Sequence, residues 1–186
     1  MPYPYIKLYE MAEDDVMQIT LRRAIPDERD ILFNLLEKYA YEFSQYDRRD
    51  VNQYGLYGYQ YLDYYWDEEC RFPYFIEADG KLAGFVLVND YPEAPDRELD
   101  YAISEFFVMY KYRRMGAGTK AFELACDAHR GRWQLKMHPH NTASVKFWTK
   151  TVSEYTGGNY ELVRAYPGTE YDDGTLGDVF FFDNGI

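Results

Sequence analysis

The sequence predicts an α/β fold of the α+β kind, in which a mixed sheet is flanked by helices. Two strand-like segments, 72–78 and 81–88, flank Asp79-Gly80. This dipeptide suits a two-residue type I′ hairpin turn, because that turn needs positive φ at both positions. Residues 103–109 are rich in aromatic and β-branched side chains, as in a strand buried on both faces. Segments with helical spacing of apolar residues alternate with these strands, which predicts layers of sheet and helix.

The first third of the chain contains one strand and one amphipathic helix. Residues 1–16 mix proline, tyrosine and acidic residues, and we expect an N-terminal extension there. Residues 17–23 alternate as a strand does, and a helix starts at Pro26. Its apolar face consists of Ile31, Leu32, Leu35, Leu36 and Tyr39. Residues 45–66 are rich in Tyr, Asp and Gly and are predicted as loop with a short helix.

The remaining elements follow the hairpin. Two prolines make 89–97 a loop, and 98–109 is the central strand. A helix over 119–130 places Phe122, Ala125 and Cys126 at helical spacing, so Cys126 is expected to be inert core. The last predicted elements are a strand at 132–138, a helix at 142–155, and strands at 160–166 and 178–183. We see no linker or repeat, and residues 17–186 are predicted to form a single domain.

Composition limits the classes of partner. The 186 residues are 47% hydrophobic and carry a net charge of −12. Binding to nucleic acid requires an excess of Lys and Arg, which this acidic chain lacks. The negative charge weakly favours cationic substrates. The alternative is that the charge only reflects a soluble acidic protein. The two cysteines, Cys70 and Cys126, make no disulfide framework. No targeting signal or membrane-spanning run is seen, so we expect a cytoplasmic protein.

A basic, glycine-rich segment joins the central strand to the next helix. Gly116 and Gly118 stand at the start of that helix, with Arg113, Arg114 and Lys120 around them. The first turn of a helix has unpaired N–H groups, and glycine lets an anion approach the backbone closely. The segment therefore predicts a diphosphate-binding site.

Two classes of diphosphate ligand fit this segment. Gly116-x-Gly118-x-x-Ala121 satisfies the loose dinucleotide pattern. That pattern expects an acidic residue at the end of the next strand, and the strand at 132–138 ends in none. The dinucleotide loop also normally opens its domain, whereas this segment lies past the middle of the chain, so we disfavour an oxidoreductase.

Arg113-x-x-Gly116-x-Gly118, preceded by the strand at 105–108, resembles the acetyl-CoA-binding signature of the GNAT superfamily of N-acyltransferases. Asn141-x-x-Ser144-x-x-Phe147-Trp148 follows at the expected distance and resembles the family's second signature. The resemblance covers residues 18–183 and is greatest to a little-characterised bacterial branch. It implies a mostly antiparallel central sheet flanked by helices, in which the strands at 98–109 and 132–138 diverge around the pantetheine arm.

The resemblance also implies an activity. The expected function is transfer of an acetyl group from acetyl-CoA to a primary amine of a small molecule or protein. A non-catalytic CoA-binding or regulatory module is the alternative, and a homodimer is one possible assembly. The implied coenzyme-binding residues are Phe107, Val108, Arg113, Arg114, Met115, Gly116, Ala117, Gly118, Thr119, Asn141, Phe147 and Trp148. Asn141 can also serve only as a helix cap.

Glu105 is the predicted general base. It stands in the apolar part of the central strand, on the same face as Phe107. Burial raises the pKa of a carboxyl group toward neutrality, where it can accept a proton from an amine. The alternative is a structural carboxylate that pairs with Arg, Lys or backbone.

Trp148 departs from the family pattern, in which a Tyr commonly protonates the leaving thiolate. An indole N–H is no useful acid, and Tyr155 is about 10 Å further along the helix. The thiolate then takes its proton from another Tyr or from water, or leaves without a general acid. Trp148 can be a packing residue.

Two further groups of residues suggest ligands. The aromatic residues Tyr57, Tyr59, Tyr61, Tyr64, Tyr65 and Trp66, with Asp63, Asp67 and Glu68, would suit an ammonium group or simply pack. His138-Pro139-His140 suggests a metal, but without further ligand spacing we expect none.

Overall fold

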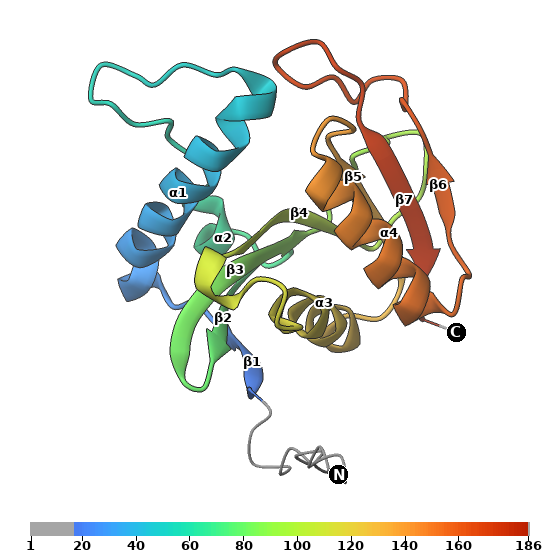
Figure 1. Cartoon of the computed structure of the whole chain (residues 1–186), viewed down its shortest axis with the longest axis horizontal. Coiled ribbons are helices and arrows are strands. Elements are labelled where there is room, and N and C mark those ends of the chain that lie inside the picture. The colour runs from blue at the N-terminus through green and yellow to red at the C-terminus, as the bar shows by residue number, and fades with distance from the viewer. Residues whose placement is uncertain (1–16, 186) are drawn as a thin grey trace, which may run out of the picture.

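The computed structural model describes residues 17–185, so the extension expected over residues 1–16 lies outside the described part. The chain forms a sheet and four α-helices, coloured along the chain in Figure 1. The strands are β1 (Ile19–Arg23), β2 (Phe72–Ala78), β3 (Lys81–Asn89), β4 (Tyr101–Val108), β5 (Arg132–Met137), β6 (Glu161–Val163) and β7 (Asp178–Asp183). The helices are α1 (Arg29–Asp47), α2 (Tyr64–Asp67), α3 (Ala117–Ala128) and α4 (Thr142–Thr156), with short 3-10 turns at Pro26–Glu28 and Tyr110–Tyr112.

The sheet has seven strands in the order β1-β2-β3-β4-β5-β7-β6. Every neighbouring pair is antiparallel except β4 and β5, which are parallel. The predicted mixed, mostly antiparallel sheet is confirmed. The hairpin between β2 and β3 is also confirmed, because Asp79 and Gly80 both have positive φ, at 49° and 70°.

Helices cover both faces of the sheet. On one face, α1 and α2 bury an apolar cluster that includes Leu32, Phe75 and Phe85. On the other face lie α3 and α4 (Figure 1), whose Phe122 and Trp148 belong to a buried apolar cluster with residues of β3, β5 and β7. The central strand thus lies between two cores, and its side chains reach both.

The first helix differs from its prediction in one residue and in length. It runs on to Asp47, and its buried face is centred on Leu32, Leu35, Leu36 and Ala40. Ile31 was predicted on this face but is 43% exposed, because the buried residues define a stripe one position away from it.

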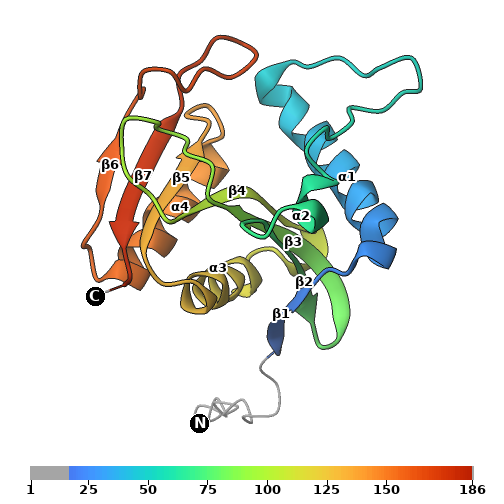
Figure 2. The same cartoon turned by 180° about the vertical axis from the view of Figure 1, so that it is seen from behind.

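The outer face of the second half of the sheet is covered by the segment between β3 and β4, seen crossing β7 in Figure 2. The side-chain amide of Gln134 in β5 accepts from Ala94 N at 2.8 Å and donates to Arg97 O at 3.1 Å. The Arg97 guanidinium lies 4.3 Å from the Phe181 ring centroid. Within residues 17–185, no helix combines the length and hydrophobicity needed to cross a bilayer.

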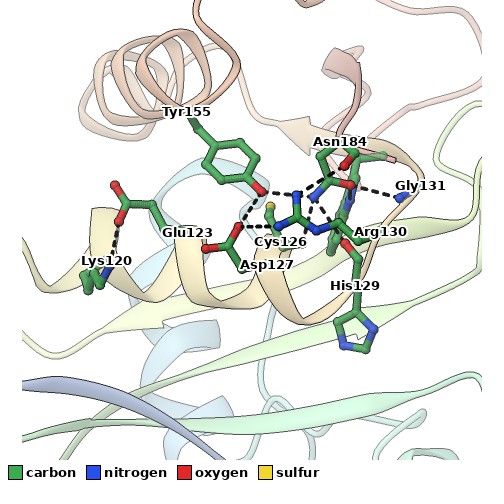
Figure 3. Close-up of polar contacts among 10 residues, drawn as sticks. Lys120, Glu123, Cys126, Asp127, His129, Arg130, Gly131, Tyr155 and Asn184 are labelled. Atoms are coloured by element: carbon green, nitrogen blue, oxygen red, sulfur yellow. Dashed lines mark hydrogen bonds and ion pairs between the residues drawn. The ribbon is translucent and has the colours of Figure 1, made fainter. Parts of the chain in front are cut away.

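Asn184, just after β7, fixes the C-terminal end of α3 (Figure 3). Its Nδ2 donates to Cys126 O at 2.7 Å, His129 O at 3.2 Å and the Tyr155 hydroxyl at 3.0 Å. Its Oδ1 accepts from Gly131 N at 2.9 Å. One side chain therefore joins α3, α4 and the start of β5, and orients the helix whose other end borders the candidate site. Tyr155 is engaged here, in agreement with the expectation that it cannot take the place of Trp148.

Candidate functional site

The parallel pair β4–β5 opens partway along its length. The two strands are paired only from Tyr101↔Trp133 to Ile103↔Leu135. Beyond this point β4 stays paired with β3 as far as Val108, and β5 stays paired with β7 as far as Met137. The predicted divergence of the two strands is therefore present, and it leaves backbone groups of β4 without a neighbouring strand.

A cleft of about 1520 Å³ begins at this divergence. It is lined by β4, the start of α4, the second half of α1 and the loop at 57–61. Ser104, Glu105 and Phe106 are only half-buried, which corrects the prediction that the strand is buried on both faces. The cleft brings together predicted site residues that are far apart in sequence: Glu105, Phe107, Val108, Arg113, Arg114, Gly118, Asn141, Phe147 and Trp148.

The backbone of Val108 faces the divergence. Met109 N donates to Ala83 O of β3 at 2.8 Å, and successive residues of a strand direct their amides to opposite sides. The N–H of Val108 therefore points toward the gap, whereas the backbone of Phe107 faces β3. Phe107 contributes its ring, which packs on Tyr39 with centroids 6.2 Å apart.

The segment after β4 presents a row of free backbone donors. Within residues 17–185, none of the N–H groups of residues 114–119 donates a hydrogen bond of normal geometry, and helical bonding begins with Lys120 N to Gly116 O at 3.0 Å. Arg114 and Gly116 have positive φ, at 61° and 83°, which curls the segment into the start of α3. Free amides together with the positive end of the helix dipole favour an anion here.

The two glycines have different roles. A Cβ at Gly116 would meet no atom within 4 Å, so only its φ angle requires glycine. A Cβ at Gly118 would lie 3.1 Å from two ring carbons of Phe147. The close approach of Gly118 to α4 therefore explains this glycine before any ligand is considered.

Arg113 is held by the protein itself. Its Nη1 and Nη2 donate to the carboxylate of Glu42 in α1 at 2.6 and 2.7 Å, and its Nε donates to Val108 O at 2.6 Å. The guanidinium also lies 4.1 Å from the Tyr110 ring centroid. In this geometry Arg113 connects α1 to the end of β4, whereas Arg114 is exposed and has no ion pair within residues 17–185, which leaves it available for a bound anion.

The other residues of the segment do not line the cleft. Met115 is 59% exposed, and the Ala117 methyl group is fully buried in the core. Thr119 faces α4, with its hydroxyl 3.4 Å from that of Thr151. Contacts of these residues with a ligand would be made through their backbone.

The second motif forms the start of α4. The Asn141 side chain caps the helix by accepting from Ser144 N at 3.0 Å, so its capping role is confirmed. Trp148 is buried and packs edge-on against Phe106, with centroids 4.9 Å apart, and against Phe122 at 5.6 Å. These contacts support a packing role for Trp148.

Glu105 lies among hydroxyl groups and apolar rings. Burial raises the pKa of its carboxyl group to about 7, while side-chain hydrogen bonding with Tyr39 and Tyr59 acts in the opposite direction. Burial and the nearby Glu105 charge raise the pKa of Tyr39 and Tyr59 well above its usual range, so both remain protonated donors. A carboxyl group with this pKa can exchange a proton near neutral pH.

The alternative role of Glu105, as a structural carboxylate paired with Arg, Lys or backbone, is not observed. Within residues 17–185 its carboxylate forms neither an ion pair nor a hydrogen bond with the backbone. Lys136 of β5, whose charge acts to lower the pKa of Glu105, is itself paired with Glu93 at 2.8 Å. Its ammonium also lies 4.9 Å from the centroid of the Tyr171 ring.

The tyrosine-rich region divides between two roles. Tyr57, Tyr59 and Tyr61 line the cleft. Tyr65 is fully buried, and the Trp66 indole donates to Ala24 O at 3.1 Å. The acidic residues of this region are partly used, because Asp63 pairs with Arg29 and Glu68 pairs with Arg71.

His138 and His140 approach Asp173, with candidate ligand atoms within 4.8 Å of one another. His138 Nδ1 accepts from His140 N at 3.2 Å, which places the proton of the neutral ring on Nε2, 3.5 Å from Asp173 Oδ1. Metal binding at Nε2 would require the other tautomer and loss of that hydrogen bond. That no metal binds remains a prediction.

Several cleft residues have no sequence motif. Glu42, Arg71 and Tyr171 come from α1, the start of β2 and the loop before β7. Tyr171 packs on Phe43 of α1 with centroids 5.7 Å apart, so the cleft is bridged on one side. Only tertiary packing brings them to the site, and no local pattern could have identified them.

Comparisons with known proteins give the family and the fold. The model of the acetyltransferase (GNAT) family matches residues 31–152. No curated protein gave a significant match. The structure is similar to a GNAT-family acetyltransferase from Streptococcus agalactiae, at 15% identity and a TM-score of 0.64, over 89% of this chain and 95% of that one. It is also similar to spermidine N-acetyltransferase from Vibrio cholerae, at 12% identity and a TM-score of 0.62, over 90% of this chain and 96% of that one.

Proposed function

This chain belongs to the acetyltransferase (GNAT) family, and we propose that it transfers an acetyl group from acetyl-CoA to a primary amine of a small molecule or peptide. Use of acetyl-CoA is implied by the family. The observation that carries the proposal is the divergence of β4 and β5 at Ile103 and Leu135, which leads directly to the free amides of residues 114–119. Such an arrangement accommodates an extended arm that ends in a diphosphate.

The residues of the cleft have distinct roles in this proposal. The free N–H groups of residues 114–119 and Arg114 hold the diphosphate, and Val108 N–H points to where a thioester carbonyl would lie. Glu105 accepts one proton from the acceptor ammonium, which leaves a neutral amine. The amine nitrogen then forms a bond to the acetyl carbon and the C–S bond breaks. The second proton lost by the nitrogen passes through solvent to the thiolate, which leaves as the thiol. A thiolate of pKa about 8.5 is a tolerable leaving group without a dedicated acid.

A non-catalytic CoA-binding module is the second candidate. The buried, packed position of Trp148, where relatives commonly carry an acid, favours it. The two candidates agree on coenzyme binding and differ only in turnover.

Two measurements test the proposal. Acetyl-CoA should raise the melting temperature, because a ligand that binds only the folded state stabilises it, by about 2.7 kcal/mol at 100-fold excess over Kd. NADH should give no shift, and stabilisation by NADH alone would overturn the assignment. Release of free thiol with a panel of amines should then separate an enzyme from a binding module, which would bind acetyl-CoA and release none above the rate without an acceptor.

A further inference from the structure

Arg71 is a buried cation that lines the same cleft as Glu105. It lies immediately before β2, and its side chain is 6% exposed. Burying a guanidinium is costly unless its N–H groups are paired. The hydrogen-bond partners of Arg71 therefore indicate whether the protein satisfies all of its N–H groups.

The protein satisfies only part of this guanidinium. Its Nε donates to Glu68 Oε2 at 2.6 Å, and its Cζ lies 4.3 Å from the Tyr91 ring centroid and 5.3 Å from those of Tyr64 and Tyr65. Within residues 17–185, neither Nη1 nor Nη2 has a hydrogen bond of normal geometry, and neither is sealed from solvent. Burial lowers the pKa of Arg71, whereas hydrogen bonding with Glu68 and with the nearby Tyr91 hydroxyl raises it. Arg71 and Tyr91 both line the cleft, so the guanidinium has one carboxylate partner and a cleft beside it.

Arg71 and Glu105 point from the same face of the sheet. Phe75, Phe85 and Phe107 are aligned across β2, β3 and β4 on the α1 side. Arg71 and Glu105 share that side, because each lies an even number of residues from Phe75 or Phe107 along its strand. They are two strand spacings apart and displaced along the strands, which gives on the order of 12 Å between Cα atoms.

Tyr65 lies beside both the strand between the two charged groups and Arg71 itself. Its hydroxyl lies 3.4 Å from Asn89 Nδ2, on the strand between them, and its ring centroid lies 5.3 Å from Arg71 Cζ. Arg71 and Glu105 both line the cleft, so a small molecule in the cleft can approach both groups.

We propose that Arg71 binds an anionic group of the acceptor, so that the acceptor is a primary amine that also carries a carboxylate, as an amino acid does. This inference rests on the proposed acetyl transfer, in which the amine lies near Glu105. A guanidinium presents parallel N–H groups that match a carboxylate, and Nη1 and Nη2 of Arg71 have no carboxylate partner within residues 17–185. Among the other cations lining the cleft, Arg113 and Lys136 are already within 2.6 and 2.8 Å of carboxylates.

Matched pairs of acceptors test the inference on the wild-type protein with acetyl-CoA. L-Lysine and cadaverine differ only in the carboxylate, as do L-ornithine and putrescine. A charge-assisted hydrogen-bonded contact contributes about 1.5–3 kcal/mol, so we expect kcat/KM to be about 10–100-fold higher for the acid of each pair. β-Alanine and 2-aminoethylphosphonate, compared with ethylamine, distinguish a carboxylate from a phosphonate; a preference for either acid supports the anionic subsite.

Variants tie the preference to Arg71. Arg71→Met combined with Glu68→Gln removes the pair without leaving a buried lone charge, and Arg71→Lys keeps the charge but loses the planar fork. We expect the double variant to lose the preference for the acceptor that carries a carboxylate, through a rise in KM for that acceptor alone. Arg71→Lys should lose part of this preference. Arg49→Met combined with Asp47→Asn is the matched control, since Arg49 lines the same cleft and pairs with Asp47, whose side chain is 5% exposed. The preference of this control for the acid should be unchanged.

A binding measurement separates this inference from the proposed function. With coenzyme A bound, L-lysine should raise the melting temperature more than cadaverine does in the wild type, and equally in the double variant. Equal effects of the two compounds in the wild type, or an unchanged preference in the double variant, would overturn the subsite. Failure to bind acetyl-CoA, or coenzyme binding without acetylation of any amine, would instead count against the proposed acetyl transfer.

Discussion

Glu42 and Arg113 form a two-point ion pair between α1 and the segment that follows β4, with N–O distances of 2.6 and 2.7 Å. Arg113 also donates to Val108 O, so one side chain links the helix, the end of the central strand and the start of the anion-binding segment. This arrangement gives Arg113 and Arg114, which are adjacent in sequence, different roles.

Arg113→Met and Arg114→Met should therefore affect different measurements. We expect Arg113→Met to lower the free energy of unfolding in urea by about 2 kcal/mol, because hydrogen bonds to a partly buried carboxylate are lost. Arg114 has no hydrogen bond or ion pair within residues 17–185, so Arg114→Met should leave stability within about 0.5 kcal/mol.

Coenzyme affinity should show the converse order, with the larger loss in Arg114→Met and the smaller loss in Arg113→Met. Titration calorimetry with coenzyme A is expected to give a weaker Kd for Arg114→Met, and the loss should shrink as salt is added. A larger loss of coenzyme affinity in Arg113→Met, with no loss of stability, would show that Arg113 leaves Glu42 to bind the diphosphate.

Gly84→Ala should be strongly destabilising. Gly84 in β3 is paired with Val108, and a Cβ there would lie 1.9 Å from Phe107 O. Since the obstructing atom is backbone, β3 and β4 would have to separate, at a cost of about 3 kcal/mol in the free energy of unfolding. Gly174→Ala is the control: its Cβ meets nothing within 4 Å, and only its φ of 81° is strained, for about 1–2 kcal/mol. Equal losses in urea unfolding would contradict the close approach.

Asn184→Ala should cost more than any single exposed polar substitution. It removes donors to Cys126 O and His129 O and leaves Trp133 Nε1 without its partner at 3.1 Å. Buried polar groups without partners cost about 1–3 kcal/mol each, so we expect a loss of about 3 kcal/mol in chemical unfolding. Asp127→Asn, a change at an exposed neighbour in the same network, should stay within about 0.5 kcal/mol. If the two variants are equally stable, Asn184 does not anchor α3.

Local patterns predicted much of this structure, and their physical reasons also explain where they stop. Asp79-Gly80 and Gly116 adopt conformations with positive φ that depend on a few adjacent residues, so the hairpin and the start of α3 could be predicted. The Glu42–Arg113 pair joins residues 71 positions apart, and Arg71 reaches the cleft only because β2 lies two strands from β4. No local spacing encodes such contacts.

Some residues of the candidate site have other partners than the sequence led us to expect. Gly118 was expected to make room for a diphosphate, and its nearest obstruction is the Phe147 ring. Ile103 to Met109 looked like a strand buried on both faces because its composition is apolar. The half-burial of Glu105 and Phe106 arises from the divergence of β5, which depends on the pairing of two strands and not on the composition of either.

Glu105→Gln should change how acetyl transfer depends on pH. With the pKa of Glu105 at about 7, the wild-type kcat/KM is expected to rise with pH as the carboxyl group ionises and to level off above that value. The variant lacks the base and should be about 10²–10⁴-fold slower at neutral pH. Its rate should recover partly at high pH, where more acceptor amine is already neutral. A folded variant with wild-type turnover at every pH would assign the proton transfer to solvent or to another group.

The same substitution should change how stability depends on pH, whether or not an acceptor is known. In the folded state the pKa of Glu105 is about 7, above its usual value of 4.5, so the folded state holds a proton that the unfolded state releases between these values. The stability that this group contributes is complete below pH 4.5 and is lost as pH rises through about 7. The full shift corresponds to about 3 kcal/mol, since one pH unit is worth about 1.36 kcal/mol. Glutamine cannot ionise, so Glu105→Gln should be more stable than the wild type at pH 8 by about 2–3 kcal/mol and nearly equal to it at pH 4.5. Urea unfolding at both pH values measures the difference, and a wild-type protein that is the more stable of the two at pH 8 would show that the ionised carboxylate has a stabilising partner.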